Sequence, residues 1–78
     1  MNLTDLASFV RVAELGTITA AAQEEGVPKS TISRRIARLE DALGVELLRR
    51  SARSFTLSDD GRTLHARSIG ALRELSEV

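Results

Sequence analysis

The chain has 78 residues, enough for one small domain with a modest hydrophobic core. Its composition, 42% hydrophobic and 28% charged, excludes an intrinsically disordered protein, and the absence of cysteine excludes a disulfide framework and a thiolate metal site. Because no apolar run is long enough to span a membrane and the N-terminus lacks a signal-peptide pattern, we expect a cytoplasmic protein.

The charged residues are unevenly distributed, although the net charge of the chain is zero. Residues 27–54 hold seven basic and three acidic side chains, a net charge of +4. Residues 1–26 have a net charge of −3, and residues 55–78 have a net charge of −1. A basic segment between acidic flanks predicts a surface that binds a polyanion such as a nucleic acid.

The first 26 residues have the pattern of two short helices. Four apolar residues recur there at helical spacing: Leu6, Phe9, Val10 and Ala13. We expect Thr4 to cap the first helix and Gly16 to end it. Thr19 is the expected cap of a second helix over residues 20–25, which Gly26 ends with a tight turn.

Residues 28–43 have the most regular helical pattern of the chain. Their apolar residues recur at intervals of four, three and four: Ile32, Ile36, Leu39 and Leu43. Pro28 suits the first helical position, where its missing N–H has no partner to lose, and Gly44 suits a left-handed C-terminal cap. A short helix, a Gly-containing turn and a longer helix predict a helix-turn-helix, although an αα-hairpin without a ligand has the same pattern.

The polar face of this third helix holds the main candidates for DNA binding. Hydroxyl groups can bond to phosphates or base edges, and an arginine can donate two hydrogen bonds to one guanine. The candidate DNA-binding residues here are Pro28, Lys29, Ser30, Thr31, Ser33, Arg34 and Arg38. We expect Arg34 to reach a base edge or the adjacent phosphate and Arg38 to bind the DNA backbone. The alternative is an amphipathic helix whose polar face is only solvated.

Two short strands are predicted after Gly44, at residues 47–50 and 55–57. Because a two-stranded ribbon alone is marginal in water, it must pack on the helices through Leu47, Phe55 or Leu57. Residues 49–55 would then form a basic wing, whose candidate DNA-binding residues are Arg50, Arg53 and Ser54. We expect Arg53 at the minor groove and Arg50 at a phosphate. An exposed hairpin with solubilising charges is the alternative.

A last helix is predicted from Ser58, its expected cap, followed by Asp59 and Asp60 at the positive end of the helix dipole. One face of it is largely apolar: Leu64, Ser68, Ala71, Leu72, Leu75 and Val78. The domain is too small to cover this whole face, which predicts a dimer interface made by Leu64, Ala71, Leu72 and Leu75. Ile69 lies off the stripe, and its expected contact is the first helix or a partner. The pattern is still running at Val78, so we expect a helix that continues beyond it.

Several segments carry a further signal through their order and spacing: Leu6 to Val10, Gly16 to Ala22, Ser33 to Glu40, Leu43 to Leu48, Arg50, Arg53, and Leu57 to Gly61. Together they resemble the N-terminal DNA-binding domain of the LysR-type transcriptional regulators. Glu25 departs from that pattern, because the family usually has a buried leucine there. The resemblance implies a mainly α fold, a winged helix-turn-helix of three helices and a two-stranded wing over residues 1–58, followed by an incomplete linker and dimerisation helix over residues 59–78.

The resemblance also implies that the protein is a bacterial regulator, which binds interrupted palindromic promoter DNA as a homodimer or tetramer. The helix at residues 28–43 would lie in the major groove and the wing at the minor groove. A small-molecule effector would bind only through a separate C-terminal domain, absent from this chain.

An enzyme is not expected. His65 is the one histidine, and Asp59 with Asp60 suits helix capping better than a catalytic pair. No phosphate-binding glycine loop or metal-ligand spacing occurs, so neither a cofactor nor a metal is expected. The competing interpretation is a winged helix that only pairs with other proteins. The basic middle segment favours DNA binding over this interpretation.

Overall fold

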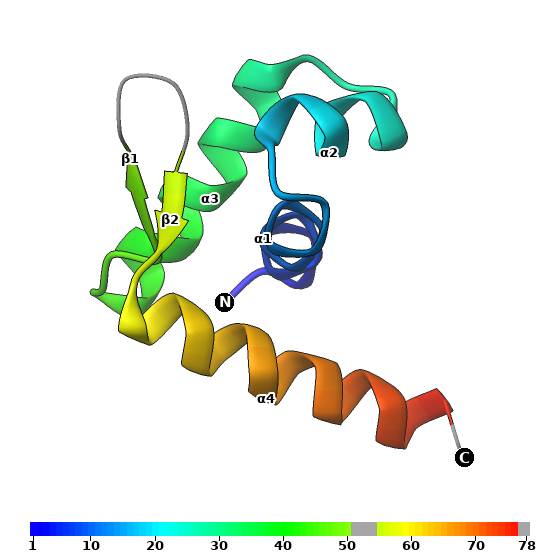
Figure 1. The fold of residues 1–78 in the computed structure, drawn as a ribbon, viewed down its shortest axis with the longest axis vertical. Helices are drawn as coiled ribbons and strands as arrows, with labels where there is room; N and C mark the ends of the chain where they lie inside the picture. Colours follow the sequence, from blue (N-terminus) through cyan, green and yellow to red (C-terminus); the bar gives the residue numbers. More distant parts are fainter. Residues whose placement is uncertain (51–54, 77–78) are drawn as a thin grey trace.

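The computed structural model describes residues 1–50 and 55–76. Its elements in chain order are α1 (Leu3–Leu15), α2 (Ile18–Glu25), α3 (Lys29–Leu43), β1 (Leu48–Arg50), β2 (Phe55–Leu57) and α4 (Asp59–Ser76). Helices α1 to α3 form one unit with the two strands at its side (Figure 1). Helix α4 runs across the end of the molecule that is farthest from α2. The mainly α winged helix-turn-helix predicted from the sequence is therefore confirmed.

The N-terminal caps of α1 and α2 were predicted two residues too late. The side chain of Asn2, rather than that of Thr4, accepts the backbone hydrogen bonds at the start of α1. In α2 the hydroxyl of Thr17, rather than that of Thr19, accepts a backbone N–H at 3.0 Å. Both positions in each pair hold good capping residues, so residue type alone could not choose between them.

Helix α3 begins one residue later than predicted. Pro28 is its N-cap, because its ψ of 152° is extended rather than helical, and the first helical residue is Lys29. Pro28 offers no side-chain hydrogen bond to the start of the helix. The C-terminal caps agree with the prediction, since Gly26 and Gly44 end α2 and α3 at φ values of 69° and 70°, which suit glycine.

The hydrophobic core lies between the first three helices and the base of the wing. Its largest fully buried apolar side chains are Phe9, Val12, Ile32, Ile36, Leu39 and Leu47. Burial of each such side chain contributes about 1.5–3 kcal/mol. The predicted stripe of α3 therefore faces the core as far as Leu39, whereas Leu43, its last member, is exposed. On α2 the small side chains of Ala21 and Ala22 are buried against the same core.

The wing is a two-stranded antiparallel sheet in which Leu48 pairs with Leu57 and Arg50 pairs with Phe55. Leu48 is buried, and Phe55 and Leu57 are half-buried against the core. The predicted packing of the ribbon on the helices through Leu47, Phe55 and Leu57 is thus confirmed.

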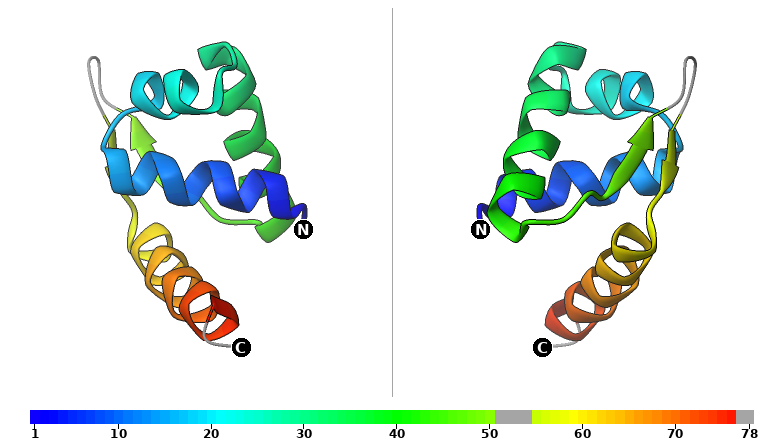
Figure 2. Two further views of the ribbon diagram at one scale, coloured as in Figure 1. Left: turned by 90° about the vertical axis from the view of Figure 1, so that its right-hand side faces the viewer. Right: turned by 90° about the vertical axis from the view of Figure 1, so that its left-hand side faces the viewer.

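Helix α4 is fixed to the wing by a tight junction. The hydroxyl of Ser58 donates to the carbonyl of Glu46 at 2.5 Å and accepts the N–H of Gly61 at 2.9 Å, as expected of a cap. Gly61 packs so closely on Leu47 that an added Cβ would lie 2.3 Å from the Leu47 carbonyl oxygen. From this junction α4 runs past α1 and extends away from the rest of the domain (Figure 2). Within residues 1–50 and 55–76, no helix is both long and apolar enough to cross a membrane.

Candidate nucleic-acid interface

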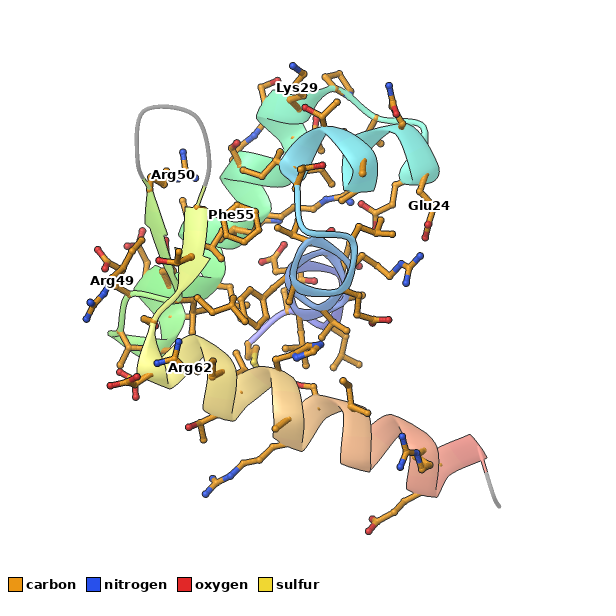
Figure 3. The ribbon with its side chains drawn as sticks, viewed as in Figure 1. Glu24, Lys29, Arg49, Arg50, Phe55 and Arg62 are labelled. Carbon is orange, nitrogen blue, oxygen red and sulfur yellow. The ribbon has the colours of Figure 1, made fainter. Side chains whose placement is uncertain are left out.

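The exposed side of α3 brings together the candidate residues of its first two turns. Of these, Pro28, Lys29, Ser30 and Arg34 are exposed, and Thr31 and Ser33 are half-buried. Lys29 at the start of α3 and Arg50 on β1 lie at the end of the molecule away from α4 (Figure 3). A shallow groove of about 800 Å³ runs between the second half of α3 and β1. Its lining includes Ala37 and Arg50 together with three acidic residues, Glu40, Asp41 and Glu46. The wing therefore adjoins the second half of the predicted recognition helix.

The ion pairs divide the basic residues of the middle segment into two groups. Three of these residues pair with a carboxylate: Arg35 with Glu25, Arg38 with Asp5, and Arg49 with Glu46. Among the residues that the structure describes, no carboxylate oxygen lies within 4.0 Å of Lys29, Arg34 or Arg50. The unpaired positive charge is thus concentrated on the first half of α3 and on β1.

The strongest of these ion pairs connects α1 to α3. Arg38 donates from Nε to one carboxylate oxygen of Asp5 at 2.7 Å and from Nη2 to the other at 2.6 Å. The hydrogen bonds from Arg38 hold the pKa of Asp5 below its ordinary value, although burial of the carboxyl opposes this. Arg38, expected to bind the DNA backbone, therefore already holds a buried carboxylate.

Asp5 was not among the candidate residues, although the sequence holds a signal for it. Asp5, Phe9 and Val12 are spaced by four and three residues, and all three are buried on one face of α1. An acidic residue in register with a core stripe requires a cationic partner. The sequence could not identify that partner, because Arg38 lies 33 residues away.

A second polar cluster joins the three helices at the site where the family usually has a leucine. The fully buried hydroxyl of Ser8 donates to Glu25 at 3.3 Å and accepts from Arg35 at 3.1 Å. Nearby, Arg11 of α1 forms a two-point ion pair with Glu24 of α2, and its hydrogen bonds lower the pKa of the Glu24 carboxyl. These contacts fix the orientation of the helix-turn-helix on α1.

The other candidate residues lie on the wing and on α4. Arg53 and Ser54 fall outside the residues that the structure describes, and so does the side chain of Leu72. Leu64 is half-buried against the domain's own core, whereas Ala71 and Leu75 are exposed. At the start of α4, Asp59 pairs with Arg62, which also donates to the carbonyl of Leu57 at 3.0 Å. In the described part of the chain, no three acidic or histidine residues gather as a metal site would require.

Comparisons with known proteins agree with this geometry. A model of the bacterial regulatory helix-turn-helix proteins of the lysR family matches residues 3–62. An HTH-type transcriptional regulator of Xanthomonas campestris is 41% identical over 77 residues, which are 99% of this chain and 22% of that protein. Such relatives are transcriptional regulators rather than enzymes.

Two solved structures are also similar. Full-length AphB, a virulence activator of Vibrio cholerae, has a TM-score of 0.89 at 38% identity, over 97% of this chain and 26% of AphB. The DNA-binding domain of BenM in complex with catB site 1 DNA has a TM-score of 0.89 at 31% identity, over 99% of this chain and 86% of that one. The chain thus spans about a quarter of its full-length relatives. It belongs to the lysR family of bacterial helix-turn-helix regulators, and it is the DNA-binding domain of a transcriptional regulator.

Proposed function

We propose that this domain binds specific sequences of double-stranded DNA, with α3 in the major groove and the wing at the adjacent minor groove. The observation that carries the proposal is the set of cations in residues 27–50 that form no ion pair with the described residues, Lys29, Arg34 and Arg50. Of these, Lys29 and Arg50 lie at the end of the molecule away from α4 (Figure 3). Their charge is not neutralised by neighbours, so it is available for phosphates and base edges. The similarity to a BenM domain that was solved in complex with DNA supports DNA binding by this domain.

The first turn of α3 suits a phosphate contact. The N–H of Thr31 donates to the Pro28 carbonyl at 3.0 Å, but Pro28 offers no side-chain hydrogen bond, so the N–H groups of Lys29 and Ser30 are open to an anion at the positive end of the helix dipole. Lys29 adds a full charge at the same place. Arg34, one turn further, is then the residue best placed to read a base, with Ser30, Thr31 and Ser33 sharing the readout.

The wing would supply the outer contacts. Arg50 is exposed on β1 and would hold a phosphate. Arg53 and Ser54 remain candidates for the minor groove on the strength of the sequence alone. Arg38 would bind the DNA backbone through the part of its guanidinium that Asp5 leaves free.

The whole regulator would act as a homodimer or tetramer on an interrupted palindrome in a bacterial cytoplasm. Residues 1–58 would bind each half-site, and residues 59–78 would belong to the helix that joins two copies. Of the predicted interface residues Leu64, Ala71, Leu72 and Leu75, Leu64 also packs against the domain's own core. A small-molecule effector would bind to a further domain beyond this segment.

Selection of bound duplexes from a random pool tests the proposal. We expect enrichment of one half-site, and of pairs of half-sites related by two-fold symmetry with centres about 10 base pairs apart or a multiple of that. Recovery of the pool without enrichment would contradict sequence-specific binding. Failure to retain any duplex at low salt would favour the competing interpretation, a winged helix that pairs only with proteins.

A further inference from the structure

Arg38 combines an exposed position with a fixed orientation. It follows Arg34 by one helical turn, so both arginines lie on the same side of α3. Its side chain is 57% exposed, whereas the partner carboxylate of Asp5 is only 1% exposed. A side chain with this much solvent access ordinarily samples many rotamers, but the two short hydrogen bonds to Asp5 hold this one in place.

The geometry of the pair leaves part of the guanidinium free. A guanidinium has five N–H donors in one plane, and Asp5 uses the edge formed by Nε and Nη2. The free edge is formed by one N–H of Nη1 and the second N–H of Nη2, and Nη1 donates to no acceptor among the described residues. That edge can donate to one phosphate while the Asp5 contact persists. A lysine could not make the two contacts in this geometry, because its ammonium is a point charge.

The pair is also an inefficient way to stabilise a small domain. Desolvation of a carboxylate costs nearly as much as the ion pair returns, and apolar residues of similar volume often replace such pairs without loss. Asp5 is buried on the face of α1 that also carries Phe9 and Val12, a face on which apolar residues are the usual occupants. Stability alone is thus a poor reason for an acidic residue there.

We propose that Asp5 is a positioning residue for DNA binding, which holds the Arg38 guanidinium so that its free edge meets a DNA phosphate. This inference rests on the DNA binding proposed above. Asp5, a buried residue of α1 outside the helix-turn-helix, would then contribute to DNA recognition through Arg38. The opposing possibility is that Asp5 neutralises Arg38 and withholds it from DNA, and the two predict changes of opposite sign when the charge of Asp5 is removed.

Asp5→Asn separates the two possibilities. Asparagine keeps the size of the side chain and one oxygen acceptor but raises the net charge of the domain by one. If Asp5 positions Arg38, binding weakens by roughly two- to tenfold, the effect of releasing one rotamer-rich side chain, despite the added positive charge. If Asp5 neutralises Arg38, binding tightens, and the slope of log affinity against log salt steepens by about 0.9 for one further phosphate contact.

Glu74→Gln provides a matched control, since Glu74 is exposed on α4 and forms no ion pair with the described residues. It changes the net charge equally and should leave binding unchanged or slightly tighter. Arg38→Lys, a second variant, keeps the charge at an exposed position and should weaken binding as Asp5→Asn does. In the double variant Asp5→Asn with Arg38→Ala, the loss should equal that of Arg38→Ala alone, because the effect of Asp5 passes through Arg38.

The measurements are fluorescence anisotropy titrations with the selected duplex and with a random-sequence duplex, at two salt concentrations, on variants that circular dichroism shows to be folded. Weaker binding of Asp5→Asn with an unchanged Glu74→Gln supports positioning. Equal or tighter binding of Asp5→Asn, or additive losses in the double variant, overturns it. A wild-type domain that binds neither duplex would contradict the proposed function itself, which is a different outcome.

Discussion

The carboxyl group of Asp5 depends mainly on Arg38 for its negative charge. Hydrogen bonds from Arg38 lower its pKa, and burial acts in the opposite direction. A carboxyl whose pKa is lower in the folded protein than in the unfolded chain stabilises the fold above its ordinary pKa of about 3.9. That contribution is lost as the pH falls through the lower pKa of the folded protein. The Asp5–Arg38 pair should therefore stabilise the domain at neutral pH and fail in acid.

Arg38→Ala should weaken this dependence. Without the guanidinium the largest cause that lowers the pKa of Asp5 is gone, and burial of the carboxyl then favours its neutral form. We expect the urea midpoint of the variant to lie below that of the wild type at pH 7, and the difference to shrink as the pH falls to 3. Urea titrations followed by circular dichroism at several pH values measure this. Arg67→Ala, on the exposed side of α4, is the control, and a difference that does not change with pH would contradict the prediction.

Arg34→Ala should affect DNA binding without affecting the fold. Arg34 is exposed and has no ion pair among the described residues, so its removal leaves no buried group without a partner. If it reads a guanine, the change should cost about 1–3 kcal/mol and relax the preference at one base position. Competition between the selected duplex and its single-base variants measures both effects. An equal loss on every duplex would reassign Arg34 to a phosphate, and Arg73→Ala on α4 serves as the unaffected control.

At the scale of elements, the sequence was most informative where backbone geometry restricts residue choice. The spacing of Ile32, Ile36 and Leu39 predicted the buried face of α3, and Gly26 and Gly44 predicted the ends of two helices. The starts of α1 and α2 were missed, because each offered two residues of equal capping ability, whereas the cap of α4 at Ser58 was predicted. The pairing of Arg38 was missed for a different reason: a contact between α1 and α3 depends on the packed structure and leaves no local pattern.

The junction between wing and α4 gives a prediction at the same scale. In Gly61→Ala the new methyl group would lie 2.3 Å from the Leu47 carbonyl oxygen, so the helix start or the wing must shift. We expect a loss of about 1–3 kcal/mol in the free energy of unfolding. Gly70→Ala is the matched variant on the same helix, where nothing lies within 4 Å of the added methyl group, and it should stabilise by up to about 1 kcal/mol. Thermal unfolding of the two variants measures the contrast, and midpoints that shift alike would contradict a close approach at Gly61.

At the scale of the whole molecule, the fold divides the basic residues of the middle segment into those that pair with carboxylates and those that do not, a division that the sequence does not show. The count of +4 over residues 27–54 includes three arginines that the fold pairs with carboxylates, two of them from α1 and α2. Of the cations in this segment that form no ion pair with the described residues, Lys29 and Arg50 lie at the end of the domain away from α4 (Figures 1 and 3). DNA binding and subunit pairing can therefore occupy opposite ends, so that neither obstructs the other.

The exposed end of α4 supports the last prediction, which concerns dimer formation. Leu64 packs against the domain's own core, but Ala71 and Leu75 follow on the part of the helix that extends away from the domain, and Leu75 is 71% exposed. A leucine this exposed, one turn after a small residue, suits the pairing of two helices about a two-fold axis. Two linked domains bind two half-sites far more tightly than one domain binds one, because the second contact is intramolecular.

Leu75→Asp should therefore weaken binding to a palindromic duplex at least tenfold, roughly the lower end of what linkage contributes, and leave binding to a half-site duplex unchanged. Sedimentation of the domain with each duplex measures the stoichiometry, and titrations measure the affinity. Thr63→Asp adds the same charge to an exposed position near the start of α4, away from Ala71 and Leu75, and should have no effect on two-site binding. If Leu75→Asp still binds the palindrome as a cooperative pair with the wild-type affinity, the exposed end of α4 is not the dimer contact.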